Sequence, residues 1–597
     1  MIELAAAMVQ AVTMWIAATC IMTGLGYAVR RLFGLRVDGC EEALRLPWLG
    51  WGVALVVLQF WHFQFPVRGF AFCVLAVPGV AGLLWGAGDL RRAVRGSGRI
   101  GLCLGALSLG VALWMAYHST TQANNYDSGL YQLTSVRWAY TYPVVPGLGN
   151  LHARLAFNNS YFLYVAVLDW GWFAGRSHQL AGALLLLWAL GRSAAGGWRV
   201  LTDRRSCRAH HLLDFLLLVP IVRLPMFGYH FHSNPSPDLG GYLLGFVLGS
   251  ELLRLLERTA AAEDMPAPRE TRQTAFQFVY IVFLCAVGIT VKLSFLVFAG
   301  AASLLALWAM LSSPAGSRRC AVRAILWAGA GLAMVILPWM VRGVILSGYL
   351  LFPGTHAGFP LPWRVPADVA DHEAAIVRSW ARKQHVPPEQ VLGNWSWLRE
   401  WIARMLGKPF EVVLPLGLAL TLAPLLAGRG RVRSAGVGAR RRTVLFLAVP
   451  CGVLLCWFWL APEPRFAGFA FWLLGAGAVS LALQRYSRQA AAAIGLACLV
   501  LFFGQSMNVL EFLHEWQRDM GPARVGRTEI KTTQSGLRVH VPVGDNRAWD
   551  APLPWTPYFN PQLRLRRPGE LESGFILESE SHPVPHPLPR ERGRGPG

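Results

Sequence analysis

The sequence predicts an all-α polytopic membrane protein with about 14 transmembrane helices. Of its 597 residues, 54% are hydrophobic and only 15% are charged, and the mean hydropathy is +0.39. A soluble multidomain protein of this length carries more charge. Apolar runs of about 20 residues, which is long enough to cross a bilayer, recur along most of the chain.

We place fourteen such runs between the amino terminus and about position 506. They lie near 4–26, 46–64, 68–88, 99–117, 176–193, 211–227, 239–256, 274–291, 293–311, 323–345, 409–427, 443–461, 467–484 and 489–506. The first run has no basic segment before it and no small-residue cleavage site after it. We therefore expect a retained helix and not a signal peptide.

Arginine-rich connections between these runs indicate which side of the membrane each connection occupies. They are Arg30, Arg31, Arg36 and Arg45; Arg91, Arg92, Arg95 and Arg99; Arg199, Arg204, Arg205 and Arg208; Arg318 and Arg319; Arg429 to Arg442; and Arg485 and Arg488. The positive-inside rule assigns all of them to the cytoplasm. Strict alternation then requires that the apolar stretch 157–173 does not cross, so we expect it to lie in or partly re-enter the outer leaflet. Both termini become extracytoplasmic, and the expected location is the bacterial cytoplasmic (inner) membrane.

The net charge of +22 could suggest nucleic acid as a partner. However, the basic residues are mostly arginines in short loops between apolar runs, so we expect no nucleic-acid binding. All ten cysteines fall in predicted helices or cytoplasmic loops. No disulfide framework is therefore expected.

Three segments remain on the predicted extracytoplasmic side. Within a transmembrane domain at 1–506, they are a first large loop at 118–175 and a second at 347–408, and a carboxy-terminal segment at 507–580 follows. The tail at 581–597 is rich in Pro, Arg, Glu and Gly and is expected to be disordered. The opposite loops are short and basic, which places function on the extracytoplasmic side.

Asp127 is the leading catalytic candidate, because it is the acid in a polar aromatic stretch at the start of the first loop. A carboxylate there could accept a proton from a sugar hydroxyl as a general base, or bind a divalent cation. The alternative is an Asx-turn that only shapes the loop. Tyr126 and Tyr131 flank Asp127 with amphipathic rings suited to the head-group layer and are candidate substrate contacts.

Three more candidates lie at the expected outer ends of helices. Asp238 could contact a ligand or cap a helix that starts at Leu239. Lys292, on the side that basic residues avoid, could bind phosphate or snorkel to lipid head groups. Arg342 poses the same choice.

Arg465 lies in the tight turn Pro462–Phe466, and its planar guanidinium suits phosphate. The alternative is a structural ion pair with Glu463. His152 and Arg154 follow a Gly- and Pro-rich turn in the first loop, and a structural role is favoured for both. His152 is kept as a candidate substrate contact.

The chain resembles a family of uncharacterised bacterial polytopic membrane proteins, which offers no activity to carry over. The similarity rests on Asn125–Tyr131, Arg137-Trp138, Tyr142–His152, Arg154–Asn158, Ser233–Asp238, Val291–Leu293, Ser347–Tyr349 and Trp549–Arg566. The family pattern would place cysteines near Trp549 and before Thr556. This chain has Ala548 and Trp555 there, so the resemblance implies no disulfide for it.

In layout the chain is also similar to the GT-C superfamily of membrane glycosyltransferases. Members have a first large outer loop with an acid near its start, juxtamembrane helices, and an apolar segment that dips before the next crossing. The stretch Asn158 to Leu190 is similar to that pattern, although Asn158-Asn159-Ser160 replaces the usual proline pair. These enzymes often use two nearby acids, and Asp127 has no acidic neighbour in sequence. A divalent cation is therefore left open as cofactor.

The resulting expectation is an integral-membrane glycosyltransferase that moves a hexose or pentose from a polyprenyl-phosphate-linked donor to a glycan, lipid or protein acceptor. Asp127 would be the base, and Arg465 with Lys292 or Arg342 would hold the departing phosphate. The alternative is a transporter or flippase of a lipid-linked or small anionic substrate. Transporters place ionisable groups near the bilayer midplane and often show repeats, and the sequence shows no repeat.

Overall fold

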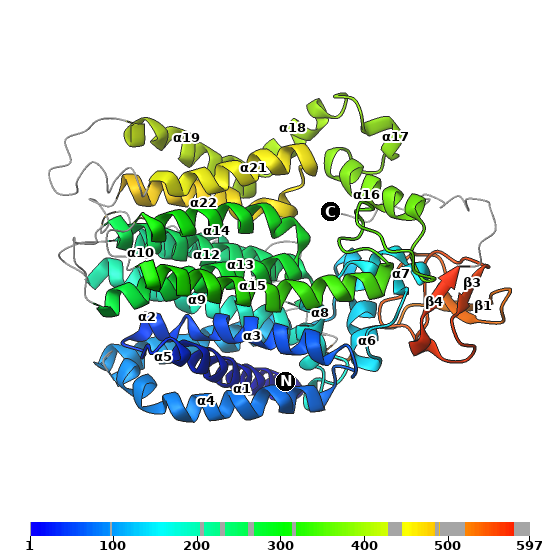
Figure 1. Cartoon of the computed structure of the whole chain (residues 1–597), viewed down its shortest axis with the longest axis horizontal. Helices are drawn as coiled ribbons and strands as arrows, with labels where there is room; N and C mark the ends of the chain where they lie inside the picture. Colours follow the sequence, from blue (N-terminus) through cyan, green and yellow to red (C-terminus); the bar gives the residue numbers. More distant parts are fainter. Residues whose placement is uncertain are drawn as a thin grey trace.

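The computed structural model describes residues 2–577, except for 96–97, 203–207, 227–232, 261–267, 313–317, 428–443, 484–488, 490–492 and 494–519. Long helices lie side by side in one bundle, and a small β-containing segment sits at one end of it (Figure 1). The arginines at 429–442, 485 and 488, Arg204 and Arg205, almost all of the run at 489–506, and the tail at 581–597 lie outside the described residues.

Nine described helices are long and apolar enough to cross a membrane. They are α1 (Ile2–Leu32), α3 (Leu46–Trp61, taken together with α2, Cys40–Ala43), α4 (Gly69–Arg95), α9 (His178–Thr202), α12 (Pro237–Ala260), α13 (Pro268–Val291), α14 (Leu296–Leu311), α15 (Arg318–Ser347) and α22 (Pro464–Ala482). A bent pair, α18 (Leu398–Leu406) with the helix that follows it, gives up to ten. The described residues therefore confirm a helical membrane protein, and each of the nine helices matches a predicted run.

The other predicted runs are not among these nine helices. The run at 99–117 coincides with α5 (Gly98–Ser119), and the run at 211–227 divides into α10 (Ala209–Leu216) and α11 (Leu218–Met226). The runs at 409–427 and 443–461 contain α19 (Leu414–Ala427) and α21 (Ala448–Leu460). A total of about 14 spans thus remains a prediction.

The stretch 157–173 behaves as the arginine pattern requires. Its helix α8 (Tyr161–Val167) has 7 residues, and all of them are buried. At about 1.5 Å per residue, such a helix covers about 10 Å, a third of the hydrocarbon core. It cannot cross the membrane by itself.

Burial separates central helices from peripheral ones. In the most apolar 18-residue stretch of α12, 94% is buried inside the protein, whereas in the corresponding stretch of α15 only 17% is buried. Figure 1 shows α12 and α13 in the middle and α4 along one edge. The central position of α12 matters because its two ends carry charged side chains.

Small residues let the amino-terminal helices approach closely. A Cβ added to Gly24 of α1 would lie 1.7 Å from the carbonyl oxygen of Gly79 in α4. Lipid-embedded helices gain packing energy when their backbones come this near. Any larger side chain at Gly24 would force α1 and α4 apart.

Both large loops fold into short helices at the same end of the bundle as the β segment (Figure 1). In the first loop these are the π-turn η1 (Ser128–Gln132), α6 (Leu133–Thr141), α7 (Leu148–Leu151) and η2 (Ala153–Ala156). In the second loop they are α16 (Ala367–Arg382), α17 (Pro388–Val391) and α18.

The carboxy-terminal segment contains two antiparallel hairpins. β1 (Thr528–Thr532) pairs with β2 (Arg538–Pro542), and β3 (Leu563–Leu565) pairs with β4 (Phe575–Leu577). Trp549 donates its backbone N–H to the carbonyl of Gly129 at 3.0 Å, which ties the segment to the first loop. Ala548 and Trp555, the residues at the expected cysteine positions, lie in one buried apolar cluster, so side-chain packing occupies this place.

Candidate functional site

Asp127 lies directly before η1, and its carboxylate does not form the turn around it. The backbone N–H of Asp127 donates to the side-chain oxygen of Asn125 at 2.9 Å. The Asx-turn that was the alternative role for Asp127 therefore belongs to Asn125. The carboxylate of Asp127 is left to contact other segments, and only 14% of its side chain is exposed.

Two arginines hold this carboxylate. Arg465 Nη1 lies 2.8 Å from Asp127 Oδ2, and Arg154 Nη1 lies 3.5 Å from Oδ1. Burial by itself would raise the pKa of Asp127, but the charges of Arg465 and Arg154 outweigh it, and the pKa is lowered. Asp127 is consequently ionised at neutral pH.

Arg465 occupies the first turn of α22, and its predicted alternative partner is wrong. Glu463 pairs instead with Lys408 at 3.0 Å and with Arg404 at 3.6 Å. The indole of Trp401 also donates to the carbonyl of Pro462 at 2.7 Å. The second large loop thus fixes the turn from which Arg465 reaches Asp127.

Asp238 and Lys292 form an ion pair beside Arg465. The helix α12 begins at Pro237, so Asp238 lies within its first turn, and the expectation that Asp238 caps a helix starting at Leu239 is wrong. Lys292 Nζ also donates to the backbone carbonyl of Arg465 at 3.2 Å. Its ammonium therefore faces the protein rather than only lipid head groups.

The turn before α12 is tied to the start of the first loop. The side-chain oxygen of Asn234 accepts hydrogen bonds from the backbone N–H groups of Asn124 and Asn125, each at 3.1 Å. These bonds hold the loop that carries Asp127 against the turn that precedes Asp238. An acidic neighbour that Asp127 lacks in sequence is thus supplied by the fold.

Arg154 links the first loop to the second, because its Nε donates to Glu373 of α16 at 2.9 Å. Its guanidinium also lies 6.0 Å from the ring centre of Tyr131. Burial, followed by the charge of Asp127, raises the pKa of Tyr131, so its phenol stays protonated as a donor. Sequence reasoning gave Arg154 a structural role and overlooked Glu373. The available signal for Arg154 was its place in the same first loop as Asp127, and no signal pointed to Glu373.

The fold thus assembles Asp127, Arg154, Asp238, Lys292 and Arg465, named here the Asp127 cluster. Its three cations face its two carboxylates, and Glu373, which pairs with Arg154, balances the third positive charge. Both carboxylates of the cluster already face a cation, whereas Arg465 and Lys292 carry several N–H groups that an anionic ligand could accept from. Two oxygens of a phosphate can accept the pair of parallel hydrogen bonds that a planar guanidinium donates.

Three predicted residues lie apart from the direct contacts of the Asp127 cluster. Tyr126 is 46% exposed, and Arg547 lies 5.3 Å from its ring centre. His152 is buried with its ring 5.6 Å from that of Tyr558. Arg342 is buried in α15, where it bonds to Asn158 and lies 3.4 Å from His62 Nδ1.

A family model described as "Domain of unknown function (DUF8201)" matches residues 8–472 of the chain. The chain belongs to this family. The matched region contains every member of the Asp127 cluster and ends before the carboxy-terminal β segment. Neither the curated proteins nor the solved structures compared with the chain gave a match.

Proposed function

We propose that the protein is an integral-membrane glycosyltransferase that moves a sugar from a polyprenyl-phosphate-linked donor to an extracytoplasmic acceptor. One observation carries the proposal: Arg465 and Arg154 contact Asp127, and Lys292, directly after α13, donates to the backbone carbonyl of Arg465. A lipid-linked phosphate is presented at this depth. The positive-inside rule supports the extracytoplasmic side, since the opposite helix ends carry Arg30, Arg199 and Arg254.

The phosphate would bind Arg465 and Lys292. The guanidinium of Arg465 can form two directed bonds to phosphate oxygens, and the ammonium of Lys292 adds a point charge. When the bond between the sugar carbon and the phosphate oxygen breaks, the electron pair goes to the phosphate. Both cations then stabilise the charge that accumulates on it.

Asp127 would act as the general base toward the acceptor hydroxyl. Its pairing with two arginines makes it a weak base before substrate binds. A guanidinium that turns toward phosphate removes one cause of the lowered pKa, so donor binding activates the carboxylate. The proton then passes from the hydroxyl to Asp127 as the oxygen attacks the sugar carbon.

The two loops would close the site around the sugar. Arg154 joins Asp127 to Glu373 of the second loop, and Tyr131 places a protonated phenol beside them. Tyrosine and charged side chains are suited to hydroxyl-rich ligands, because they offer both donors and acceptors. Tyr126 and His152 lie on the same first loop and complete the expected acceptor side.

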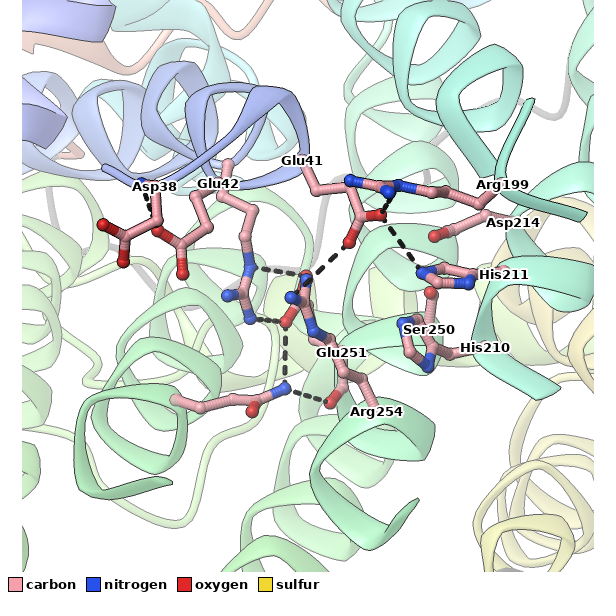
Figure 2. Close-up of polar contacts among 12 residues, drawn as sticks. Asp38, Glu41, Glu42, Arg199, His210, His211, Asp214, Ser250, Glu251 and Arg254 are labelled. Atoms are coloured by element: carbon pink, nitrogen blue, oxygen red, sulfur yellow. Dashed lines mark hydrogen bonds and ion pairs between the residues drawn. The ribbon is translucent and has the colours of Figure 1, made fainter. Parts of the chain in front are cut away.

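A specific observation favours transport as a second candidate. Arg45, Arg192 and Glu251 form buried ion pairs within helices long enough to span the membrane. In Figure 2, Glu251 lies at the centre of several polar contacts. Buried ionisable residues in spans often mark a substrate or ion pathway.

Binding of purified protein to a polyprenyl phosphate, measured by native mass spectrometry, tests the anion site. We expect Arg465→Ala and Lys292→Ala to weaken binding at least about tenfold, the effect of losing about 1.4 kcal/mol. Arg399→Ala is the matched control, since Arg399 is an exposed arginine of the second loop. Equal binding by all four proteins would reject the phosphate site.

Turnover separates the two candidates. Protein in lipid vesicles receives polyprenyl-phosphate hexoses and pentoses, and release of polyprenyl phosphate is measured together with lipid crossing. We expect wild-type protein to release it, and Asp127→Asn to bind the donor without releasing it. Lipid that crosses unchanged, with no release, would replace the glycosyltransferase proposal with transport.

A further inference from the structure

A second polar cluster lies at the other end of the helices from Asp127. The helix α12 carries Asp238 near its start and Glu257 near its end, about 28 Å apart at about 1.5 Å per residue. His210 of α10 pairs with Glu257, and the adjacent His211 pairs with Glu41 of α2; Figure 2 shows the two histidines and Glu41. Glu41, His210, His211 and Glu257 have no part in the proposed transfer reaction.

Glu41, His210 and His211 each offer one donor atom, and the three atoms lie within 4.8 Å of one another. His211 Nε2 is 3.2 Å from Glu41 Oε1, and the two imidazole ring centres are 4.1 Å apart. Adjacent helix residues do not normally share a face. Here both rings nevertheless come close to one carboxylate.

Glu257 holds His210 in the tautomer that a metal ligand needs. The Nδ1 of His210 faces Glu257 Oε2, while the backbone N–H of Ala209 donates to Oε1 of the same carboxylate at 2.5 Å. A proton on Nδ1 leaves the lone pair on Nε2 free. A carboxylate behind a histidine is the usual outer partner of metal-bound imidazole.

The second observation is a buried ring nitrogen of His210 that faces no hydrogen-bonding group among the described residues. His210 is 1% exposed, and its Nε2 has no hydrogen-bond partner among the described residues. His211, which is 8% exposed, faces Glu41 with its other ring nitrogen, Nε2, at 3.2 Å from Oε1. Buried polar nitrogens without partners are costly unless an ion or water satisfies them.

Two arginines also contact Glu41, and their charges must be offset. Arg199 Nε lies 2.7 Å from Oε1, and Arg254 Nη2 lies 3.5 Å from Oε2. The Arg199 side chain is 50% exposed, so it can turn into solvent when a cation binds Oε1. Glu41 and Glu257 then balance the charge of Arg254 and one of the two charges of the cation.

We propose that Glu41, His210 and His211 bind a transition-metal ion of the Zn²⁺ class, with Glu257 as the positioning residue for His210. Two imidazoles and one carboxylate are ligands that Zn²⁺ prefers, and they leave a fourth position for water. The site is independent of the Asp127 cluster.

The test uses the full-length protein, purified without a polyhistidine tag and titrated with Co²⁺ and then Zn²⁺. We expect about one metal ion per chain by elemental analysis and a tetrahedral Co²⁺ absorption spectrum that Zn²⁺ abolishes. His210→Ala and His211→Ala should weaken binding at least tenfold, and Glu257→Gln about 10- to 100-fold. The exposed His356 provides the matched control, His356→Ala.

Wild-type protein with no Co²⁺ spectrum and no bound metal would overturn the proposal without any variant. Metal binding that persists unchanged in His210→Ala or His211→Ala would overturn it equally. The measurement needs no turnover, so its failure is distinguishable from failure of the glycosyltransferase proposal.

Discussion

Asp127 and Arg465, which are 338 residues apart in the chain, form an ion pair with 2.8 Å between Oδ2 and Nη1. The pair joins the first large loop to the turn between α21 and α22. It also places a carboxylate and a guanidinium side by side at the ends of spanning helices. Asp238, Lys292 and Arg154 complete the Asp127 cluster, and Glu373 pairs with Arg154 from the second loop.

The first prediction concerns Arg465→Lys. Lysine keeps the charge but cannot form two directed bonds to phosphate, so we expect turnover to fall about tenfold or more, as loss of one charged hydrogen bond of about 1.5–3 kcal/mol requires. Release of polyprenyl phosphate by protein in lipid measures it. Arg399→Lys, at an exposed position, is the control. Wild-type turnover in Arg465→Lys would remove Arg465 from the reaction.

The second prediction is that Asp127→Asn lowers stability as well as activity. The substitution leaves Arg154 and Arg465 without the shared carboxylate, at a cost of about 1–3 kcal/mol. Combining it with Arg465→Gln should restore part of the loss, because the uncompensated charge is also removed. Thermal unfolding in detergent measures both effects. Strictly additive losses would show that the two side chains are not coupled.

The same ion pair predicts an acid-sensitive contribution to stability. The pKa of Asp127 is lowered in the folded protein, so its pairing stabilises the fold above the unfolded value of about 3.9. The contribution is lost as pH falls through the folded pKa. The difference in unfolding free energy between wild type and Asp127→Asn should therefore shrink between about pH 5 and pH 3. A constant difference across that range would contradict the pairing.

The third prediction concerns Asp169, which follows α8. Its Oδ1 accepts the backbone N–H of Gly175 at 2.5 Å, and burial followed by the charge of Asp550 raises its pKa to about 6. A raised pKa in an acid costs stability as pH rises from about 4 to about 6. Asp169→Asn keeps the acceptor without the charge, so it should be more stable than wild type at pH 7 by up to about 3 kcal/mol.

Thermal unfolding of both proteins from pH 4 to pH 7 measures this effect. The advantage of Asp169→Asn should grow through the pH window and then level off. Asp545→Asn, at an exposed position, should show no such growth. If Asp169→Asn is no more stable than wild type at pH 7, then ionisation of Asp169 does not destabilise the folded protein.

The fourth prediction is topological. In a cysteine-free background, Ser396→Cys in the second loop should react with a membrane-impermeant thiol reagent in intact cells, because Ser396 is exposed on the expected outer side. A second variant that keeps only the natural Cys40, exposed at the opposite helix ends, should react only after permeabilisation. The reverse pattern would invert the assignment of sides.

Much of the fold was predictable because hydropathy is a local property. Nine predicted runs appear as spanning helices among the described residues, and the short α8 agrees with a stretch that does not cross. The broken helices at α10 and α11 were not predictable from apolar content, which is continuous there. Strand β2 follows the alternating pattern at its position in the carboxy-terminal segment.

Four residues of the Asp127 cluster stood out in the sequence, whereas the part of Arg154 and the pairing of the charges did not. Asp127, Asp238, Lys292 and Arg465 stood out because charged residues at the ends of spanning helices are few. Glu463 was expected to pair with Arg465, two positions away, yet it pairs with Lys408 and Arg404. Sequence proximity misled here because the turn directs the two side chains to different loops.

The sequence by itself determined that this is a helical membrane protein, where most of its helices lie and which few polar residues merit attention. Those properties depend on the hydrophobicity of neighbouring residues, which any window along the chain reports. Only the tertiary structure decided that Asp127 meets Arg465 and that Glu41 meets His211. Ion pairs depend on which helix ends come together, and that is set by packing of whole helices against one another. Such packing sums many weak contacts over long sequence separations, so no local pattern encodes it.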